Sequence, residues 1–473
     1  MSELQPVERM SPVDRAWLEM DDPHNPMIVS AIFQLEGPVD AAELQKVMVE
    51  RLLRFPRFRQ RADRSQRQPR WVADNDLDYR YHVHVRRLPH GASQQELCKA
   101  ISAEVSHELD TARPLWRLFL FPCPTGPVTV LFRAHHALAD GIALVTLLID
   151  STDKGFLRAP APGSALALPA PHPGPLGGLV DRLTTLNAGL IRLQELARDR
   201  RGRAQLRQKF DEGRDAVRGV RRVMALPEDH PSALRRPLNG RKTVAWIDDL
   251  PLLALRRQAK RLDARVNDLL MTALAGAFSH ELQRSGEPLP PSGELRISVP
   301  VNLRNGKGRD LGNQFGLVLL ELPLGIDAPE VRLRTIARRM SELKNSAEAR
   351  ATLLGLAAAG HLPVPLEKRL VNRISSKSVA VVSSLPGPKN HVRIAGARMS
   401  SLVFWPPQSG GIGIGVSFFS YAGHVSVGIS IDGGLHLHAR HLLQAFRREM
   451  DYLLALDFET EASVSAALDA TLI

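Results

Sequence analysis

The sequence has little cysteine and lacks a long uncharged apolar run. Only Cys98 and Cys123 occur among 473 residues, which provides no disulfide framework and fits a reducing compartment. No apolar run reaches the roughly 18 residues that span a bilayer, and the N-terminus lacks the basic start and apolar stretch of a signal peptide. We therefore expect a cytoplasmic protein whose contact with a membrane, if any, is peripheral.

Aromatic residues are scarce, at 5% of the chain, and they are not interleaved with the basic patches. Nucleic-acid binding is therefore not expected, because single-strand binding surfaces combine basic grooves with stacking aromatic rings. The chain nevertheless carries a formal net charge of +12. This charge favours anionic partners, of which phosphorylated substrates and lipid headgroups remain.

Two common catalytic motifs are also missing. No Gly-x-Ser-x-Gly sequence occurs, which argues against a serine hydrolase with its nucleophile on a strained turn. The glycine-rich segment 410–415 lacks the Lys-Ser/Thr pair of a phosphate-binding loop. These glycines are expected instead to let two backbones approach closely.

The length and the proline distribution predict two domains. A chain of 473 residues is too long for one compact core, and residues 158–178 contain six prolines, which is typical of a linker. We expect an N-terminal domain over 1–157, a proline-rich linker and basic helical connector over 158–235, and a C-terminal domain over 236–473. The connector has an apolar stripe and an excess of basic residues, so it could pack on the protein or press onto anionic lipid.

Helical and strand-like patterns alternate along both halves of the chain. Apolar residues at helical spacing predict helices at 44–55, 141–149, 252–262, 267–279 and 331–343. Segments rich in β-formers predict strands at 128–134, 243–247, 295–301, 379–382, 416–421 and 424–431, the last two joined by a tight turn at Ala422-Gly423. Interspersed helices and strands indicate a mixed α/β architecture.

The segment from Tyr79 to Val85 alternates between two kinds of residue and is expected to form a strand. The alternation places His82 and His84 on one face of it. They could bind a metal, but no cysteine or carboxylate accompanies them, so we interpret both as surface residues.

The segment His135-His136-Ala137-Leu138-Ala139-Asp140-Gly141 lies between a predicted strand and a predicted helix. A neutral imidazole near pH 7 can accept a hydroxyl proton and later return it to a leaving group, as acyl transfer to an alcohol requires. Neighbouring side chains on an extended backbone point in opposite directions, so one histidine is expected to face substrate while the other packs. We assign the base to His136 and the packing role to His135.

The other members of this segment have supporting roles. Asp140 could orient the histidine, but we favour pairing with an arginine that holds the turn in shape. Gly141 lets the backbone turn without steric cost. A zinc site would need a cysteine or a further histidine nearby, so no metal is expected. The alternative is that both histidines only satisfy local hydrogen bonds.

The His-His-x-x-x-Asp-Gly pattern resembles that of acyltransferases with the chloramphenicol-acetyltransferase-like fold, which include peptide-synthetase condensation domains. Further segments resemble the bacterial wax ester synthase/diacylglycerol acyltransferase family, in the family's order and over nearly the whole chain. They are Ser11-Pro12-Val13-Asp14, Pro114-Leu115-Trp116, Asn267-Asp268, Pro300-Val301-Asn302-Leu303-Arg304, Gly312-Asn313-Gln314 and Pro386-Gly387-Pro388.

The resemblance implies two similar α/β domains of the chloramphenicol-acetyltransferase-like type with a tunnel between them. Fatty acyl-CoA would enter from one side and a diacylglycerol or long-chain alcohol from the other, giving triacylglycerols or wax esters. His136 matches the family's base, Asp140 a mainly structural position, and Asn267 a residue near the active site from the second domain. The resemblance implies no cofactor, since acyl-CoA is a co-substrate, and a location on the inner membrane face or on lipid inclusions.

The chain departs from the family pattern at two places. Ser383-Ser384-Leu385 stands where the family usually has Ser-Asn before a hydrophobic residue, and the family's Pro-Val-Ser-Val-Arg is altered at Asn302 and Leu303. Two other functions stay open on the sequence alone. One is an acyltransferase or condensing enzyme of secondary metabolism supplied by a carrier protein, and the other is a non-catalytic protein of lipid surfaces. Substrate chain lengths, the balance of products and the oligomeric state do not follow from the sequence.

Overall fold

The computed structural model describes most of the two predicted domains. The described residues are 8–37, 39–66, 69–123, 126–158, 225, 234–302, 315–344, 369, 372–435 and 437–456. The predicted linker and connector lie outside the described residues except at their ends and at Ala225.

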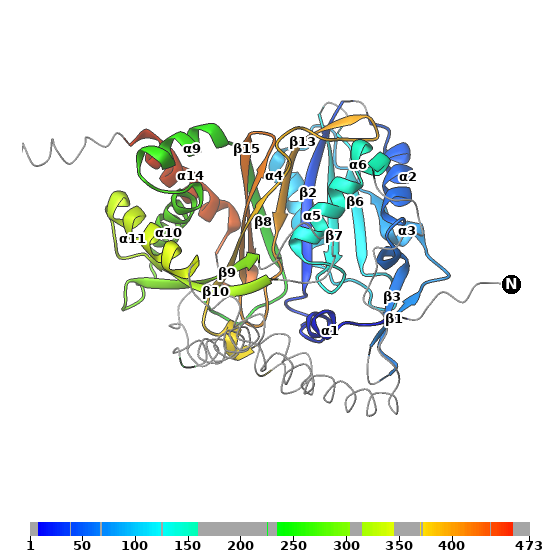
Figure 1. Ribbon diagram of the computed structural model, residues 1–473, viewed down its shortest axis with the longest axis horizontal. Coiled ribbons are helices and arrows are strands. Elements are labelled where there is room, and N and C mark those ends of the chain that lie inside the picture. Colours follow the sequence, from blue (N-terminus) through cyan, green and yellow to red (C-terminus); the bar gives the residue numbers. More distant parts are fainter. Residues whose placement is uncertain are drawn as a thin grey trace, which may run out of the picture.

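Two six-stranded sheets form the centre of the molecule (Figure 1). The first has the order β12 (Arg393–Ile394), β13 (Ala397–Trp405), β2 (Ile28–Glu36), β7 (Val128–His135), β6 (Trp116–Phe121) and β5 (Val83–Val85). The second has the order β10 (Phe315–Pro323), β9 (Glu294–Asn302), β11 (Ala380–Pro386), β14 (Ile414–Tyr421), β15 (His424–Asp432) and β8 (Lys242–Pro251). A small sheet joins β1 (Glu8–Arg9), β4 (Arg70–Ala73) and β3 (Gln60–Asp63).

Helices cover the outward faces of both large sheets, and one further helix, α4 (Gln94–Val105), packs against residues of both sheets. The first sheet packs against α2 (Ala41–Leu52) and α5 (Gly141–Asp150) on one side and α4 on the other. The helix layer on the second sheet contains α9 (Leu252–Arg261), α10 (Val266–Arg284), α11 (Pro329–Lys344) and α14 (Ala439–Ala455), and lies at the left of Figure 1. The remaining short elements are α1 (Pro12–Glu19), η1 (Pro56–Arg59), α3 (Tyr79–His82), α6 (Asp153–Arg158) and η2 (Gly433–Leu435).

The second half of the chain contributes two strands to the first sheet. Strand β13 pairs antiparallel with β2, where Leu402 lies opposite Phe33. Its residues alternate between two apolar clusters, because Leu402 packs with α2 and α5 while Val403 packs with α4 and β8. Residues 393–405 therefore belong structurally to the first sheet, although they lie inside the range 236–473.

The predicted helices and strands listed above are found within a few residues of their expected limits. The turn between β14 and β15 also forms, with positive φ angles of 46° at Ala422 and 89° at Gly423. Such angles at both central residues suit a hairpin of two antiparallel strands.

The prediction for Tyr79–Val85 was wrong in part. Asp78 accepts a hydrogen bond from the Arg80 backbone, and this cap starts the helical turn α3, so only Val83–Val85 is a strand. His82 is fully buried rather than on the surface: its ring stacks on Trp116 at 4.4 Å, and Nδ1 lies 2.8 Å from the Trp116 carbonyl oxygen. His84 is partly buried.

Candidate active site

The turn between β7 and α5 carries the His-His-x-x-x-Asp-Gly segment. Strand β7 ends at His135, and α5 begins at Gly141. The carboxylate of Asp140, only 3% exposed, caps α5 by accepting a 2.8 Å hydrogen bond from the Ala143 backbone. Because such a cap satisfies an N–H group that a helix leaves unbonded at its start, Asp140 fixes where the helix begins.

His135 has a close polar partner at each ring nitrogen. Its Nε2 lies 3.2 Å from Oδ2 of Asp21, and its Nδ1 accepts a 3.1 Å hydrogen bond from the Ala137 backbone. Burial acts to raise the pKa of Asp21, but the contact with His135 lowers it below its ordinary value. Asp21 is therefore a carboxylate near pH 7, and its contact with Nε2 fixes the orientation of the His135 ring.

His136 turns away from this pair and packs against Trp17 of α1. The two ring centroids are 4.5 Å apart, and the His136 backbone N–H donates a 2.7 Å hydrogen bond to the Met27 carbonyl oxygen. Burial lowers the pKa of His136 to about 3, and neighbouring His135 acts in the same direction. The imidazole is therefore neutral near pH 7, which is the form that can accept a proton.

The second half of the molecule reaches this turn through β11. A Cβ atom placed on Gly141 would lie 3.4 Å from Cδ1 of Leu385, so the start of α5 packs against this strand. The adjacent Ser384 donates a 3.0 Å hydrogen bond from Oγ to Oδ1 of Asn267, the second residue of α10. The structure thus connects Asn267 to the turn through two neighbouring residues of one strand, Ser384 and Leu385.

The sequence of the chain matches the models of a known protein family. The profile of the wax ester synthase/diacylglycerol acyltransferase catalytic domain matches residues 10–270, and that of the family's C-terminal domain matches residues 311–453. The chain belongs to the wax ester synthase/diacylglycerol acyltransferase family. It is an acyltransferase, with an acyl donor and an acceptor as its substrates.

Individual members of the family are similar over almost the whole chain. A protein of Mycobacterium tuberculosis named as a probable diacylglycerol O-acyltransferase is 24% identical over 464 residues, 95% of this chain and 96% of its own. A Mycobacterium bovis protein, also named as a diacylglycerol O-acyltransferase, is 29% identical over 416 residues, covering 83% of this chain and 80% of its own.

Solved structures show the same fold. A wax ester synthase/diacylglycerol acyltransferase from Marinobacter aquaeolei aligns with a TM-score of 0.67 at 19% identity and covers 94% of this chain and 98% of its own. The starter condensation domain of rhizomide synthetase, in complex with C8-CoA, aligns with a TM-score of 0.58 at 14% identity, over 95% of this chain and 94% of its own. The expected mixed α/β fold with two chloramphenicol-acetyltransferase-like domains is confirmed.

His136 is almost completely buried. Its side chain is 5% accessible, and neither of two small cavities in the described part of the chain is lined by it. Neither cavity is therefore the tunnel that the resemblance implies.

Trp17 and Asp21 were not identified from the sequence as site residues. Both follow Ser11-Pro12-Val13-Asp14, where the Ser11 hydroxyl caps α1 by accepting a hydrogen bond from the Asp14 backbone. This segment, which resembles the family pattern, was the only indication in the sequence that the region is near the site. It marks where α1 begins, but it does not indicate that Trp17 and Asp21 will contact the two histidines. Within the described residues, no group of three or more His, Cys, Asp or Glu side chains is arranged to hold a metal.

Proposed function

We propose that this acyltransferase moves a long-chain fatty acyl group from fatty acyl-CoA to diacylglycerol and to long-chain alcohols, with His136 as the general base. The observation that carries the proposal is the buried imidazole of His136, which packs against Trp17 on the turn between β7 and α5, within the matched catalytic domain. His135, Asp140, Gly141 and Asn267 would support that turn, and no cofactor besides the co-substrate acyl-CoA takes part.

In this reaction His136 accepts the proton of the acceptor hydroxyl as the oxygen attacks the thioester carbonyl carbon. The new C–O ester bond forms and the C–S bond breaks, so the CoA thiolate leaves. The imidazolium then returns its proton to the thiolate, which restores the neutral base. No covalent intermediate with the enzyme is needed.

A small apolar cavity lies beside α5, the helix that begins directly after the His136 turn. It encloses about 10 Å³, and its lining includes Val145 and Leu148 of α5 together with Phe419 and Tyr421 of β14. This is about the space that one water molecule occupies, so the cavity does not hold part of an acyl chain.

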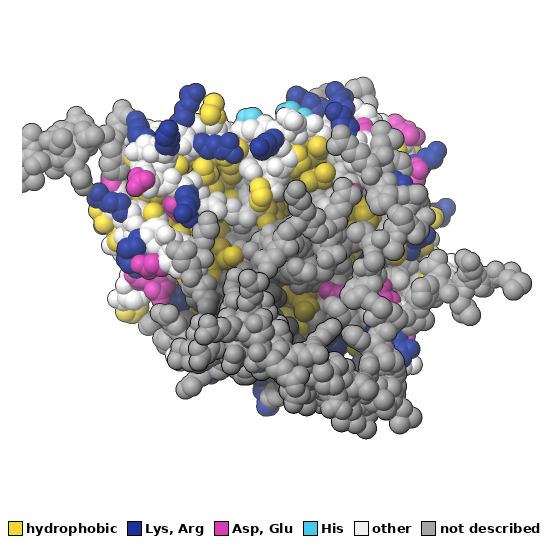
Figure 2. All heavy atoms as spheres, in the orientation of Figure 1, with side chains coloured by type: hydrophobic (Ala, Val, Ile, Leu, Met, Phe, Trp, Pro, Cys, Tyr) yellow, Lys and Arg dark blue, Asp and Glu magenta, His cyan; other side chains and the backbone are white. Residues whose placement is uncertain are grey.

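A basic edge of the molecule supports a lipid surface as the place of action. Figure 2 shows Lys and Arg side chains gathered along the upper edge, over α9 and the adjoining strand ends, with hydrophobic side chains between them. Arg256, Arg257 and Lys260 of α9 are exposed, as is Lys389 beside the apolar cavity. Charge and apolar area together would favour peripheral binding to anionic lipid. Among the described residues, no helix combines the length and apolar character needed to cross a bilayer.

The test is the release of free thiol from palmitoyl-CoA by the purified chain, with diacylglycerol or a fatty alcohol as acceptor, in neutral or anionic vesicles. His136→Ala is expected to lower turnover by about 10² to 10⁴-fold, the usual contribution of a general base. Its unfolding temperature should also fall, because removing a buried ring that packs on Trp17 leaves a cavity, so turnover is compared per folded molecule.

Three results would contradict parts of the proposal. Near-normal turnover by folded His136→Ala protein would remove the assigned base. Activity with an acyl carrier protein as donor, and none with acyl-CoA, would replace the proposed donor. Equal rates in neutral and anionic vesicles would remove the lipid-surface role of the basic edge.

A further inference from the structure

The backbone of the proposed base is held by a loop that precedes β2. Oδ1 of Asp21 accepts a 2.6 Å hydrogen bond from the Met27 backbone, and the Met27 carbonyl oxygen accepts the 2.7 Å hydrogen bond from the His136 backbone. The other carboxylate oxygen of Asp21 faces His135 at 3.2 Å. Residues 21–27 therefore set the position of both histidines.

This loop is in turn tied to the second half of the molecule by Asn25, whose side chain is fully buried. Its Nδ2 donates hydrogen bonds of 3.0 Å to the Gly410 carbonyl oxygen and 2.9 Å to the Ile412 carbonyl oxygen, on the connection from β13 to β14. Its Oδ1 accepts a 3.0 Å hydrogen bond from Nζ of Lys242. One amide thus makes three hydrogen bonds, and all of them lead to the other half.

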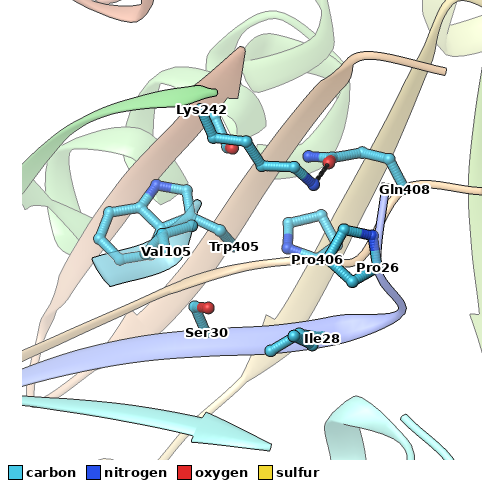
Figure 3. Close-up of a pocket in the computed structure, with 9 residues that line it drawn as sticks. Pro26, Ile28, Ser30, Val105, Lys242, Trp405, Pro406 and Gln408 are labelled. Atoms are coloured by element: carbon cyan, nitrogen blue, oxygen red, sulfur yellow. Dashed lines mark hydrogen bonds between the residues drawn. The ribbon is translucent and has the colours of Figure 1, made fainter. Parts of the chain in front are cut away.

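Lys242 is the first residue of β8, and its ammonium points into the interior between the two sheets, as Figure 3 shows. The side chain is buried, and Nζ also donates a hydrogen bond to Oε1 of the fully buried Gln408. Burial lowers the pKa of Lys242 to about 8, while the charges of Asp432 and Asp21 oppose this shift. A buried ammonium needs such oxygen partners, so losing Asn25 would be costly here.

We propose that Asn25 and Lys242 are positioning residues that hold the His136 turn in its reactive place by anchoring residues 21–27 to the second half of the protein. The inference rests on the proposed role of His136 as the base. Neither residue is expected to touch substrate. Their effect passes through Met27 to the backbone of His136, and a misplacement of about 1 Å at a reacting group can cost 10²-fold in rate.

The test combines steady-state kinetics with hydrogen exchange of the substrate-free protein. For Asn25→Ala we expect kcat to fall by about 10²-fold, with the KM values for palmitoyl-CoA and diacylglycerol unchanged. The amides of Met27 and His136 should exchange faster, because they lose the fixed geometry of their acceptors.

Gln258→Ala is the matched control. Gln258 is also a buried amide, and its Nε2 donates to the carbonyl oxygens of Leu453 at 2.7 Å and Leu456 at 3.0 Å, in the outer helix layer. Its loss should lower the unfolding temperature while leaving kcat and the exchange of the Met27 and His136 amides unchanged. Should Asn25→Ala itself not fold, Asn25→Ala combined with Lys242→Met removes the amide and the charge together and is expected to show the same loss of kcat.

The outcomes separate this inference from the proposed function. An inactive His136→Ala protein beside an Asn25→Ala protein of normal kcat overturns the anchoring role alone. An active His136→Ala protein overturns the role of His136 as the base. In that case, faster exchange of the Met27 and His136 amides in Asn25→Ala would still support the anchoring of residues 21–27, and unchanged exchange would overturn it. A loss of kcat without faster exchange, or an equal loss in Gln258→Ala, also contradicts the inference.

Discussion

The His136 turn of the first half and the outer helix layer of the second half both bury ionisable groups, with opposite consequences. In the helix layer, Glu449 of α14 lies 3.2 Å from Arg332 of α11 and 2.9 Å from His280 of α10. The carboxylate therefore faces two basic groups. At the turn, by contrast, burial lowers the pKa of His136 so far that the imidazole is neutral.

The difference separates a structural use of burial from a chemical one. A buried carboxylate that contacts basic groups on two other helices fixes three helices relative to each other. The layer is built around that pair, since a Cβ atom on Gly276 of α10 would lie 2.0 Å from Nη1 of Arg332. A buried imidazole whose charge is suppressed is instead unprotonated at neutral pH, and the same burial makes it a weaker base.

The largest expected effect on stability comes from removing the buried carboxylate of the outer helix layer. Glu449→Ala leaves the Arg332 guanidinium buried without its carboxylate, which typically costs about 3–5 kcal/mol of unfolding free energy. Denaturant unfolding should show this loss, while turnover per folded molecule stays near that of the parent. A loss of turnover without a loss of stability in Glu449→Ala would place this cluster in the chemistry and remove the contrast.

The sequence predicts the elements of the fold better than their assembly. Long periodic segments such as 252–262 and 331–343 form the expected helices, because their apolar spacing depends only on local geometry. The crossing of β12 and β13 into the first sheet was not predicted. Residues 401–405 read as a short apolar run, and nothing local specifies that β2 will be its partner.

The same limit applies to the site. His136 and Asp140 stand in one contiguous segment, so both could be singled out from it. An arginine partner was expected for Asp140, and the structure shows its carboxylate capping α5. Trp17, Asp21 and Asn25 lie far from that segment in sequence, and only the tertiary fold brings them to it. The low pKa of His136 follows from that packing, so no sequence pattern could have indicated it.

A second prediction sharpens the claim that burial by Trp17 keeps His136 neutral. With a pKa of about 3, His136 should hold its base form throughout the neutral range, so the acid limb of kcat/KM should lie well below the ordinary histidine value of 6.5. Trp17→Ala admits water beside the ring and makes the imidazolium less costly. The apparent pKa of the acid limb of kcat/KM should then rise towards 6.5, and activity at about pH 6 should fall more than activity at about pH 8.

The control for this shift is Trp246→Ala. Trp246 is also buried, but it packs on Trp405 with centroids 5.9 Å apart, in the cluster between β8 and α4. It should lower stability without moving the limb. His135, held by Asp21, acts on His136 in both variants alike. A limb near 6.5 already in the parent protein would show that burial does not set the pKa.

The smallest expected effect concerns the link from the turn to the second half. Ser384→Ala removes the 3.0 Å hydrogen bond to Asn267, and a typical hydrogen bond contributes about 0.5–1.5 kcal/mol. If that link helps to place the two halves for reaction, turnover should fall roughly twofold to tenfold. Ser285→Ala is the matched control, because the Ser285 hydroxyl bonds to the Glu281 and Leu282 carbonyl oxygens at the far end of the same helix. Equal rates for Ser384→Ala and Ser285→Ala would mean that the serine in place of the family's asparagine supports only the fold, and that the His136 turn needs no help from α10.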